Sequence, residues 1–478
     1  MQSCSGWQEK CETGFQYMEV QSLISKEAFR RFYVLAGAAV MIAVQAVMIY
    51  LILHNIYNQD FRTQLYTRGH LLVMGIYLGV FVLLGKVFGG LLVGGRRNGE
   101  VMFSLLFTSL LSNAVFYMIM MMYSFKFPTP VPILGVTGLQ IFFGSFWISG
   151  TGNLYRRLFK PYDVLLVYWG KATDNFVAKV KTRKDQFRIV DSIEATEDLS
   201  EIYSKINKCG TIMLWDLPTS IRNTVFKYCY ENSKRIYIMP KISDIILNGS
   251  KPVHMFDTPL LLTEGSPLQY EERVLKRVMD FVLALLLIIV TSPIMLAAAL
   301  AIKLYDGGPV LYKQVRCTKN NRTFEIYKFR SMIVDAEKRG TAVLAREHDN
   351  RITPVGRIIR KVRIDELPQA FNILRGDMSF VGPRPERPEF IQKYVQDMPE
   401  FAYRTKVKAG LTGYAQLYGK YNTLPYDKLK LDLYYIEQYS FWLDLQLLIL
   451  TVKILFTMES TEGVKESTAD GKEKDGNG

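Results

Sequence analysis

Two adjacent acidic residues, Asp365 and Glu366, are of a type and spacing suited to phosphate or metal chemistry. They precede Pro368, which a helix tolerates only in its first turn, and Gly376, which is a natural helix stop. We therefore expect a helix that begins near Asp365 or Glu366. The positive end of its dipole would keep both carboxylates ionised and would attract a phosphate or support a metal bound to their oxygens. An N-cap Asp followed by a first-turn Glu is also common without any catalytic role.

Basic residues that could bind phosphate occur on both sides of this pair. Arg384 lies between Pro383 and Pro385, so its loop loses little entropy when the planar guanidinium binds an anion. A solvated arginine on a stiff surface loop is the alternative interpretation. Further cations stand upstream, at Lys328, Arg330 and Arg351 and in a predicted helix over 357–363. That helix would be basic on one side and apolar on the other, as is typical of a surface helix facing lipid headgroups.

Four long apolar runs precede these residues and predict membrane-spanning helices. They cover residues 33–53, 71–93, 101–124 and 131–149. Each approaches the roughly 20 apolar residues that a helix needs to cross the hydrocarbon core. Lys and Arg are more frequent in the loops that share a side with the N-terminus, which places residues 1–32 and everything after residue 150 in the cytoplasm. We therefore expect a multi-pass protein of the inner (cytoplasmic) membrane with its C-terminal part in the cytoplasm.

A fifth apolar run, Phe281–Ile302, contains Ser292-Pro293 at its middle. Proline removes a helical hydrogen bond, so the helix must bend there. Both flanks of the run are basic, which favours a re-entrant helix over 278–302 whose two ends stay on the cytoplasmic side. A kinked spanning helix is the alternative. The basic segment 303–420 has no further run long enough to span, and we expect it to lie on an anionic membrane surface.

Residues 160–250 alternate short β-rich runs with helical patterns, which predicts a Rossmann-like α/β domain with a parallel sheet. The expected strands are Asp163–Tyr168, Phe187–Val190, Thr211–Trp215 and Arg235–Met239. The first strand-to-helix turn lacks G-x-G-x-x-G, so we interpret the domain as regulatory or structural rather than dinucleotide-binding. Residues 251–271 are expected to be a linker, and residues 459–478 a disordered tail.

The overall composition excludes several classes of protein. The chain has 478 residues, 49% of them hydrophobic, and a formal net charge of +14, which excludes a small single-core domain and a wholly disordered chain. Its five cysteines show no C-x-x-C spacing, so neither a zinc site nor a disulfide framework is indicated. The basic balance points to phosphate-bearing partners such as nucleotides, anionic lipids or nucleic acid.

Short motifs follow one another along residues 272–458. They are Lys276-Arg277-Val278-Met279-Asp280, Ser292-Pro293, Gly308-Pro309-Val310, Lys328-Phe329-Arg330-Ser331-Met332, Asp365-Glu366-Leu367-Pro368-Gln369, Gly376-Asp377-Met378-Ser379-Phe380-Val381-Gly382-Pro383-Arg384-Pro385, Gly410-Leu411-Thr412-Gly413 with Ala415-Gln416, and Leu431-Asp432-Leu433-Tyr434-Tyr435 with Ser440 and Asp444. Together and in this order they resemble the bacterial sugar transferase family. These are polyprenyl-phosphate hexose-1-phosphate transferases, also called monotopic phosphoglycosyl transferases. The preceding membrane and α/β segments resemble the larger members, which initiate exopolysaccharide or capsule synthesis.

The resemblance implies a reaction and a catalytic domain over 272–458. A sugar-1-phosphate would pass from a UDP-sugar to undecaprenyl phosphate with release of UMP, in a ping-pong mechanism with Mg²⁺. Asp365 matches the nucleophile that forms a phosphosugar intermediate, and Glu366 matches the residue that binds the metal. By the same resemblance, Arg384 binds phosphate, Asp432 and Asp444 are acidic positions near the site, and Ser292 and Pro293 break the re-entrant helix. We also expect the cations Lys328, Arg330 and Arg351 to bind phosphate, and Gln369 and Pro383 to belong to the active site.

The implied partners are a UDP-sugar, undecaprenyl phosphate and membrane lipids. Tyr414 stands where the family usually has Trp, and Ser331 where Thr is common, so the transferred sugar stays open. Whether the protein is a homodimer is also open.

Two other functions remain as alternatives. One is a non-catalytic membrane scaffold built on a degenerate transferase domain, which the intact Asp365, Glu366 and Arg384 argue against. The other is a membrane-tethered nucleic-acid binder, which only the charge suggests. Because the basic segment lacks a recognition motif, we expect no nucleic-acid partner.

Overall fold

The computed structural model describes residues 5–59, 61, 64–170, 173–196, 199–265, 267–334, 351–419 and 423–455, with the side chains of the first helix from Lys26 onward. The predicted tail 459–478 lies outside these residues. The chain forms two compact units, Met1–Met239 and Pro240–Gly478. Each unit is described by itself.

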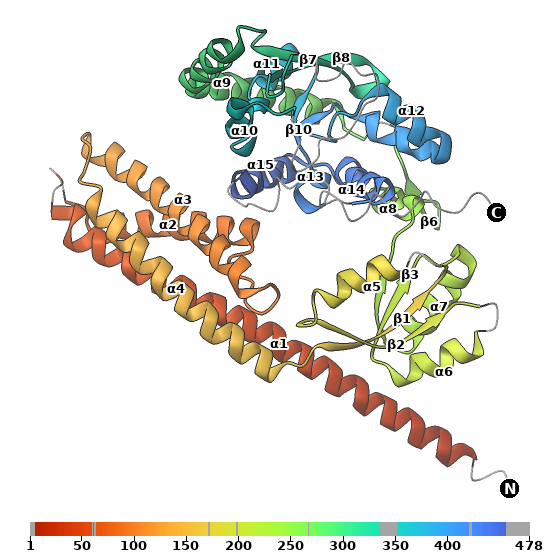
Figure 1. Ribbon diagram of the computed structural model, residues 1–478. Coiled ribbons are helices and arrows are strands. Elements are labelled where there is room, and N and C mark those ends of the chain that lie inside the picture. Colours follow the sequence, from red (N-terminus) through yellow and green to blue (C-terminus); the bar gives the residue numbers. More distant parts are fainter. Residues whose placement is uncertain are drawn as a thin grey trace. The chain divides into compact units, whose positions relative to one another are not determined.

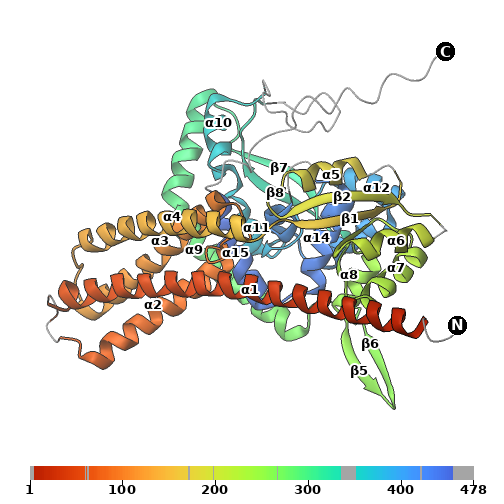
Figure 2. The same cartoon turned by 90° about the horizontal axis from the view of Figure 1, so that it is seen from below.

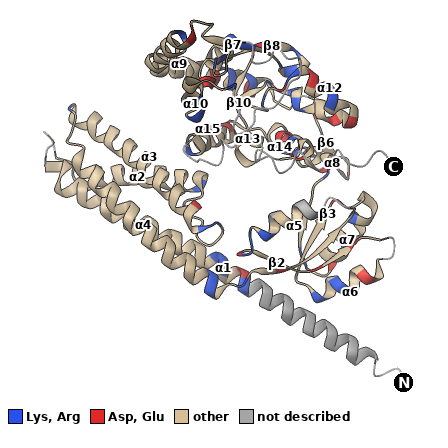
Figure 3. Cartoon of the chain, viewed as in Figure 1, with Lys and Arg blue, Asp and Glu red and all other residues tan. Residues whose placement is uncertain are grey.

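The first unit begins with a bundle of long apolar helices (Figure 1). They are α1 (Ser5–Asn55), α2 (Thr67–Phe88), α3 (Asn98–Ser124) and α4 (Val131–Leu158). Three predicted spans lie wholly inside α1, α3 and α4, whereas the predicted span 71–93 extends past the end of α2 at Phe88. Within the described residues, five helices are long and apolar enough to cross a membrane, these four and one in the second unit. Helices α2 to α4 carry almost no charge along their length (Figure 3).

Polar side chains link the helices inside the bundle. Asn113 Nδ2 donates to Gln140 Oε1 at 2.7 Å, and Gln140 Nε2 donates to the Tyr77 hydroxyl at 3.1 Å. These bonds join α3, α4 and α2. Unpaired polar groups are costly in hydrocarbon, so such hydrogen bonds help to fix how the helices pack.

An α/β domain follows the bundle. Its strands are β1 (Tyr162–Tyr168), β2 (Phe187–Glu194), β3 (Thr211–Trp215) and β4 (Arg235–Ile238), in the parallel order β2-β1-β3-β4. Helices α5 (Thr173–Lys181), α6 (Ser200–Lys208) and α7 (Thr219–Glu231) connect them. The predicted strands and the parallel sheet are therefore confirmed.

Specific contacts attach the α/β domain to the membrane bundle within this unit. Glu27 of α1 forms an ion pair with Arg235 at the start of β4 and accepts a hydrogen bond of 2.7 Å from the Tyr162 hydroxyl. On the loop between α2 and α3, Arg97 donates to the Thr182 carbonyl at 2.7 Å. The long helix α1 thus belongs to the bundle and also contacts the α/β domain through Glu27.

Two sequence-based boundaries were wrong. Helix α8 (Ile242–Asn248), which we assigned to the α/β domain, belongs to the second unit because Ile245 is buried in that unit's core. The predicted linker instead contains a hairpin of β5 (Lys251–Met255) and β6 (Thr258–Leu262), which projects in Figure 2. Its prolines suggested irregular chain, but both strands of an isolated hairpin are edge strands, where proline is tolerated.

The second unit is built around helix α9 and a set of short elements. They are α9 (Tyr270–Asp306), the antiparallel pair β7 (Leu311–Cys317) and β8 (Thr323–Phe329), α10 (Pro354–Lys361), the 3₁₀ turn η3 (Ile364–Glu366), α11 (Gln369–Arg375), β9 (Ser379–Val381), α12 (Pro388–Asp397), η4 (Pro399–Lys406), β10 (Gly410–Thr412), α13 (Tyr414–Tyr418), α14 (Pro425–Glu437) and α15 (Phe441–Leu455). A further short turn, η2 (Lys319–Asn321), joins β7 to β8. The core gathers Ala284 of α9, Ile373 of α11 and Leu433 of α14.

Helix α9 is continuous in secondary structure through Pro293. The Ser292 hydroxyl donates to the Ile289 carbonyl at 2.8 Å, which is the carbonyl that the missing N–H of Pro293 would otherwise bond. Both ends of the helix pack on the unit, whereas Val290 near its middle is 72% exposed. This exposed apolar surface suits lipid contact, and the re-entrant course stays a prediction.

Candidate active site

Asp365 and Glu366 lie in a 3₁₀ turn between two helices rather than at the start of one. Arg363 adopts a left-handed conformation (φ 55°) after α10 and turns the chain into η3. The α-helix begins only at Gln369, with Pro368 as its N-cap residue, and ends at Gly376 (φ 92°). The predicted start at the acidic pair was therefore wrong, because proline cannot supply an N–H to the preceding turn, and the predicted stop at Gly376 was confirmed.

Glu366 is the centre of a cluster of cations. Its Oε1 lies 3.2 Å from Lys328 Nζ and 3.2 Å from Arg384 Nη2, and its Oε2 lies 3.7 Å from Arg363 Nη1. Although burial opposes the charge, the three cations hold the pKa of Glu366 far below its usual range. Glu366 is thus ionised at any physiological pH.

Asp365 has a different environment although it is the adjacent residue. Burial and the negative charge of Glu366 raise the pKa of Asp365, while Lys328, Arg360 and Arg363 partly offset that effect. Among the described residues, none donates a hydrogen bond to its carboxylate. In this pair, Glu366 is an ionised carboxylate held by cations. Asp365 has the higher pKa of the two, and its carboxylate oxygens are available to react.

The loop that carries Arg384 is held by close backbone packing. Strand β9 pairs in parallel with β10, and Gly410 N donates to the Pro383 carbonyl at 2.9 Å. A side chain on Gly382 would collide with the backbone of Lys408 and Gly410. Glycine is therefore required at this crossing, and the loop presents the half-exposed side chain of Arg384 to Glu366.

Three other predicted site residues have the following positions and contacts. Buried Arg330 forms an ion pair with Asp306 at the end of α9, and its guanidinium fills the space that a side chain on Gly308 would need. The Arg351 carbonyl accepts a hydrogen bond of 2.9 Å from Ile333 N, and Gln369 is the buried first residue of α11.

The two predicted acids of the C-terminal helices are both buried and bind different cations. Asp432 of α14 lies 2.8 Å from Arg404, and Asp444 of α15 lies 2.5 Å from Lys276. The structure thus brings Lys328 and Arg384 to the acidic pair and places these two acids in separate networks.

Three residues near the site were not assigned to it from the sequence. Arg363 and Arg360 appeared only as parts of a basic surface helix, and Arg404 belongs to no recognisable motif. The left-handed turn at Arg363, which brings its side chain back to Glu366, has no clear signal in the sequence. Arg404 is 5% exposed, and burial of an arginine cannot be predicted without the fold.

A divalent cation would find only part of a ligand set in the protein. No group of three or more His, Cys, Asp or Glu side chains able to hold a metal occurs among the described residues. Mg²⁺, however, is commonly bound by one or two carboxylates, with waters and substrate phosphates as its remaining ligands. The neighbouring carboxylates of Asp365 and Glu366 fit that mode of binding.

Comparisons with known proteins match the segment of the chain that contains this site. Residues 271–458 match the family described as bacterial sugar transferase. The uncharacterized sugar transferase EpsL of Bacillus subtilis (strain 168) is 38% identical over 198 residues, which cover 41% of this chain and 95% of EpsL. The chain belongs to the bacterial sugar transferase family. The matched segment contains the acidic pair, Lys328, Arg384 and all of α9 beyond Tyr270.

Two further similar proteins are named for the transfer of different sugars. A UDP-N-acetylgalactosamine-undecaprenyl-phosphate N-acetylgalactosaminephosphotransferase of Aeromonas hydrophila is 41% identical over 225 residues, covering 46% of this chain and 52% of that protein. A UDP-glucose:undecaprenyl-phosphate glucose-1-phosphate transferase of Caulobacter vibrioides (strain ATCC 19089 / CIP 103742 / CB 15) is 40% identical over 217 residues, covering 44% of this chain and 81% of that protein. The chain spans about half the length of several curated relatives that it matches.

Proposed function

We propose that this protein transfers a sugar-1-phosphate from a UDP-sugar to undecaprenyl phosphate, releasing UMP, at the cytoplasmic face of the inner membrane. The observation that carries the proposal is the acidic pair, in which Glu366 is fixed by three cations and Asp365 is left with a raised pKa. A diphosphate would find cationic partners beside a carboxylate nucleophile. Family membership and the names of the relatives support the reaction class.

The reaction proceeds in two displacements at one phosphorus atom. A carboxylate oxygen of Asp365 attacks the sugar-bearing phosphorus of the donor, and the bond from that phosphorus to the bridging oxygen breaks, so UMP leaves with the bridging oxygen. A phosphate oxygen of the lipid then attacks the same phosphorus and returns the carboxylate of Asp365. The product is undecaprenyl diphosphate-sugar.

The surrounding side chains bind and orient the donor. Arg384 and Lys328 hold its phosphate oxygens, and the carboxylate of Glu366 orients these two cations while the donor is absent. Bound Mg²⁺, held by Glu366 and Asp365 together with the donor phosphates, would neutralise diphosphate charge and make UMP a better leaving group. The exposed apolar surface of α9 supports contact with lipid, and such contact would hold the site near the lipid phosphate.

An exchange experiment tests the two-step reaction. Purified protein in nanodiscs with Mg²⁺ and a panel of UDP-sugars is expected to release UMP when undecaprenyl phosphate is added. Without the lipid, it should still exchange labelled UMP into the matching UDP-sugar, because the first displacement needs no acceptor. UMP release without any exchange would exclude the covalent intermediate, and a failure to release UMP with every donor would exclude the function.

A further inference from the structure

Two arginine side chains from elsewhere in the second unit, the buried Arg404 and the partly buried Arg316, hold the segment that carries Arg384. Arg404 Nη2 donates to the Arg384 carbonyl at 3.1 Å, and Arg316 Nη1 donates to the Pro385 carbonyl at 3.1 Å. The side chain and the backbone carbonyl of Arg384 therefore have different partners. Its side chain contacts Glu366 and its own carbonyl contacts Arg404.

Arg404 depends in turn on Asp432. The guanidinium is 5% exposed and lies 2.8 Å from the Asp432 carboxylate, which is itself 1% exposed, and 3.6 Å from Glu386. A buried arginine that loses its carboxylate must find another partner, recruit water or move. Asp432 thus holds the Arg404 guanidinium in the position from which it donates to the Arg384 carbonyl.

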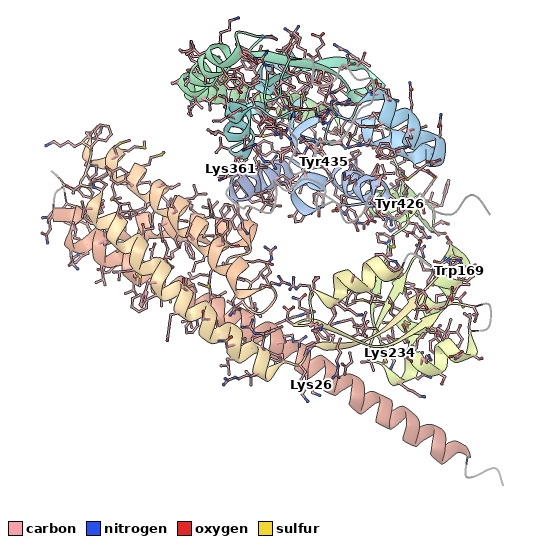
Figure 4. All side chains as sticks on the ribbon, in the orientation of Figure 1. Lys26, Trp169, Lys234, Lys361, Tyr426 and Tyr435 are labelled. Atoms are coloured by element: carbon pink, nitrogen blue, oxygen red, sulfur yellow. The ribbon has the colours of Figure 1, made fainter. Side chains whose placement is uncertain are left out.

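Asp444 belongs to a different network, although it is equally buried. It lies 2.5 Å from Lys276 Nζ and accepts a hydrogen bond of 2.8 Å from the Tyr435 hydroxyl. These contacts tie α15 to α9 and α14 in the core, and Figure 4 labels Tyr435 in the second unit. The Tyr435 hydroxyl of this network also lies 3.1 Å from the carbonyl of Val381, the last residue of β9.

We propose that Asp432 is a positioning residue for the donor phosphates, acting through Arg404 on the backbone of Arg384, whereas Asp444 stabilises the packing of α9, α14 and α15. The inference rests on the proposed function, in which Arg384 holds a donor phosphate. It separates two acids that the sequence motifs leave equivalent.

A double-mutant cycle tests the coupling. Asp432→Asn should raise KM for the UDP-sugar about tenfold and change kcat by less than about threefold, because the loop no longer holds Arg384 in place. In an Arg384→Ala background, the same substitution should raise KM by less than about twofold. Equal factors in the two backgrounds would overturn the proposal.

Asp444→Asn is the matched control, since it also neutralises one buried carboxylate. It should lower the melting temperature, and its effect on KM, whatever its size, should be the same with and without Arg384. If Asp444→Asn instead shows the dependence on Arg384 and Asp432→Asn does not, the assignment of the two acids is reversed and the proposal fails.

Hydrogen exchange supplies a readout that does not require turnover. The backbone amides of residues 379–390 should exchange their hydrogens at least about tenfold faster in Asp432→Asn than in the unchanged protein. The rate in Arg404→Lys should fall between these two. Unchanged protection in a folded Asp432→Asn protein would contradict the positioning role. If the unchanged protein releases no UMP, the proposed function fails, and this exchange measurement alone decides whether Asp432 positions the loop.

Discussion

At the scale of single residues, the site works by making two neighbouring carboxyl groups unlike each other. Glu366 has three cations within 3.7 Å, whereas burial and the neighbouring negative charge of Glu366 raise the pKa of Asp365. Divergent pKa values in an acidic pair are a common sign of divided roles. The sequence predicts the pair and two of its cations, but Arg363 joins the cluster only because of a left-handed turn.

Substitution of the two acids should separate their roles. Asp365→Asn removes the attacking oxygen, so we expect a loss of at least about 1,000-fold in both UMP release and UMP exchange. Glu366→Gln keeps the attacking oxygen but leaves Lys328, Arg363 and Arg384 without their carboxylate, and should lose about 100-fold in kcat/KM. Full activity in folded Asp365→Asn protein would refute the nucleophile assignment.

The raised pKa of Asp365 makes a prediction about pH. An attacking carboxylate must be ionised, so activity should fall as the pH falls through the pKa of Asp365. Lys328 is among the charges that lower this pKa, and Lys328→Met should therefore raise it and move the acidic limb of the kcat/KM profile to higher pH. A loss of activity with no change in the midpoint would show that another group sets that limb.

At the scale of elements, the sequence predicts best those helices and strands that have a clear local sequence pattern. The long apolar helices, the four parallel strands and the stop of α11 at Gly376 have strong local patterns, and each is present. The hairpin over 251–262 was missed because its prolines favour loops, and the start of α11 was misplaced because a 3₁₀ turn has no period of its own. Arg330 pairs with Asp306 through tertiary packing, which spacing along the chain cannot reveal.

Helix α10 offers a matched pair of substitutions. Ile359 is 4% exposed and packs against Ala298 and Ile302 of α9, whereas the adjacent Ile358 is 68% exposed. Ile359→Ala should lower the free energy of unfolding by about 2–5 kcal/mol because it leaves a cavity. Ile358→Ala should leave it nearly unchanged and weaken lipid contact. Denaturation in nanodiscs measures the first effect, and similar destabilisation by both variants would contradict the packing of α10 on α9.

At the scale of the whole molecule, the family match and the site fall in the same unit. Residues 271–458 lie within the second unit, and the match covers 95% of EpsL, which has no room for a large additional domain. The first unit has its own membrane bundle, its own sheet and its own contacts between them, such as the ion pair of Glu27 with Arg235. We therefore expect the proposed reaction to need only the second unit.

A truncated chain beginning at Pro240 should therefore insert in nanodiscs and release UMP with a kcat within about tenfold of the full chain. The reason is that every side chain in the Glu366 cluster, the whole of α9 and the Asp432 network are contributed by residues after 240. The same truncation with Asp365→Asn is the control for background hydrolysis. If the truncated protein is folded by circular dichroism and yet releases no UMP, the first unit must contribute to the reaction directly.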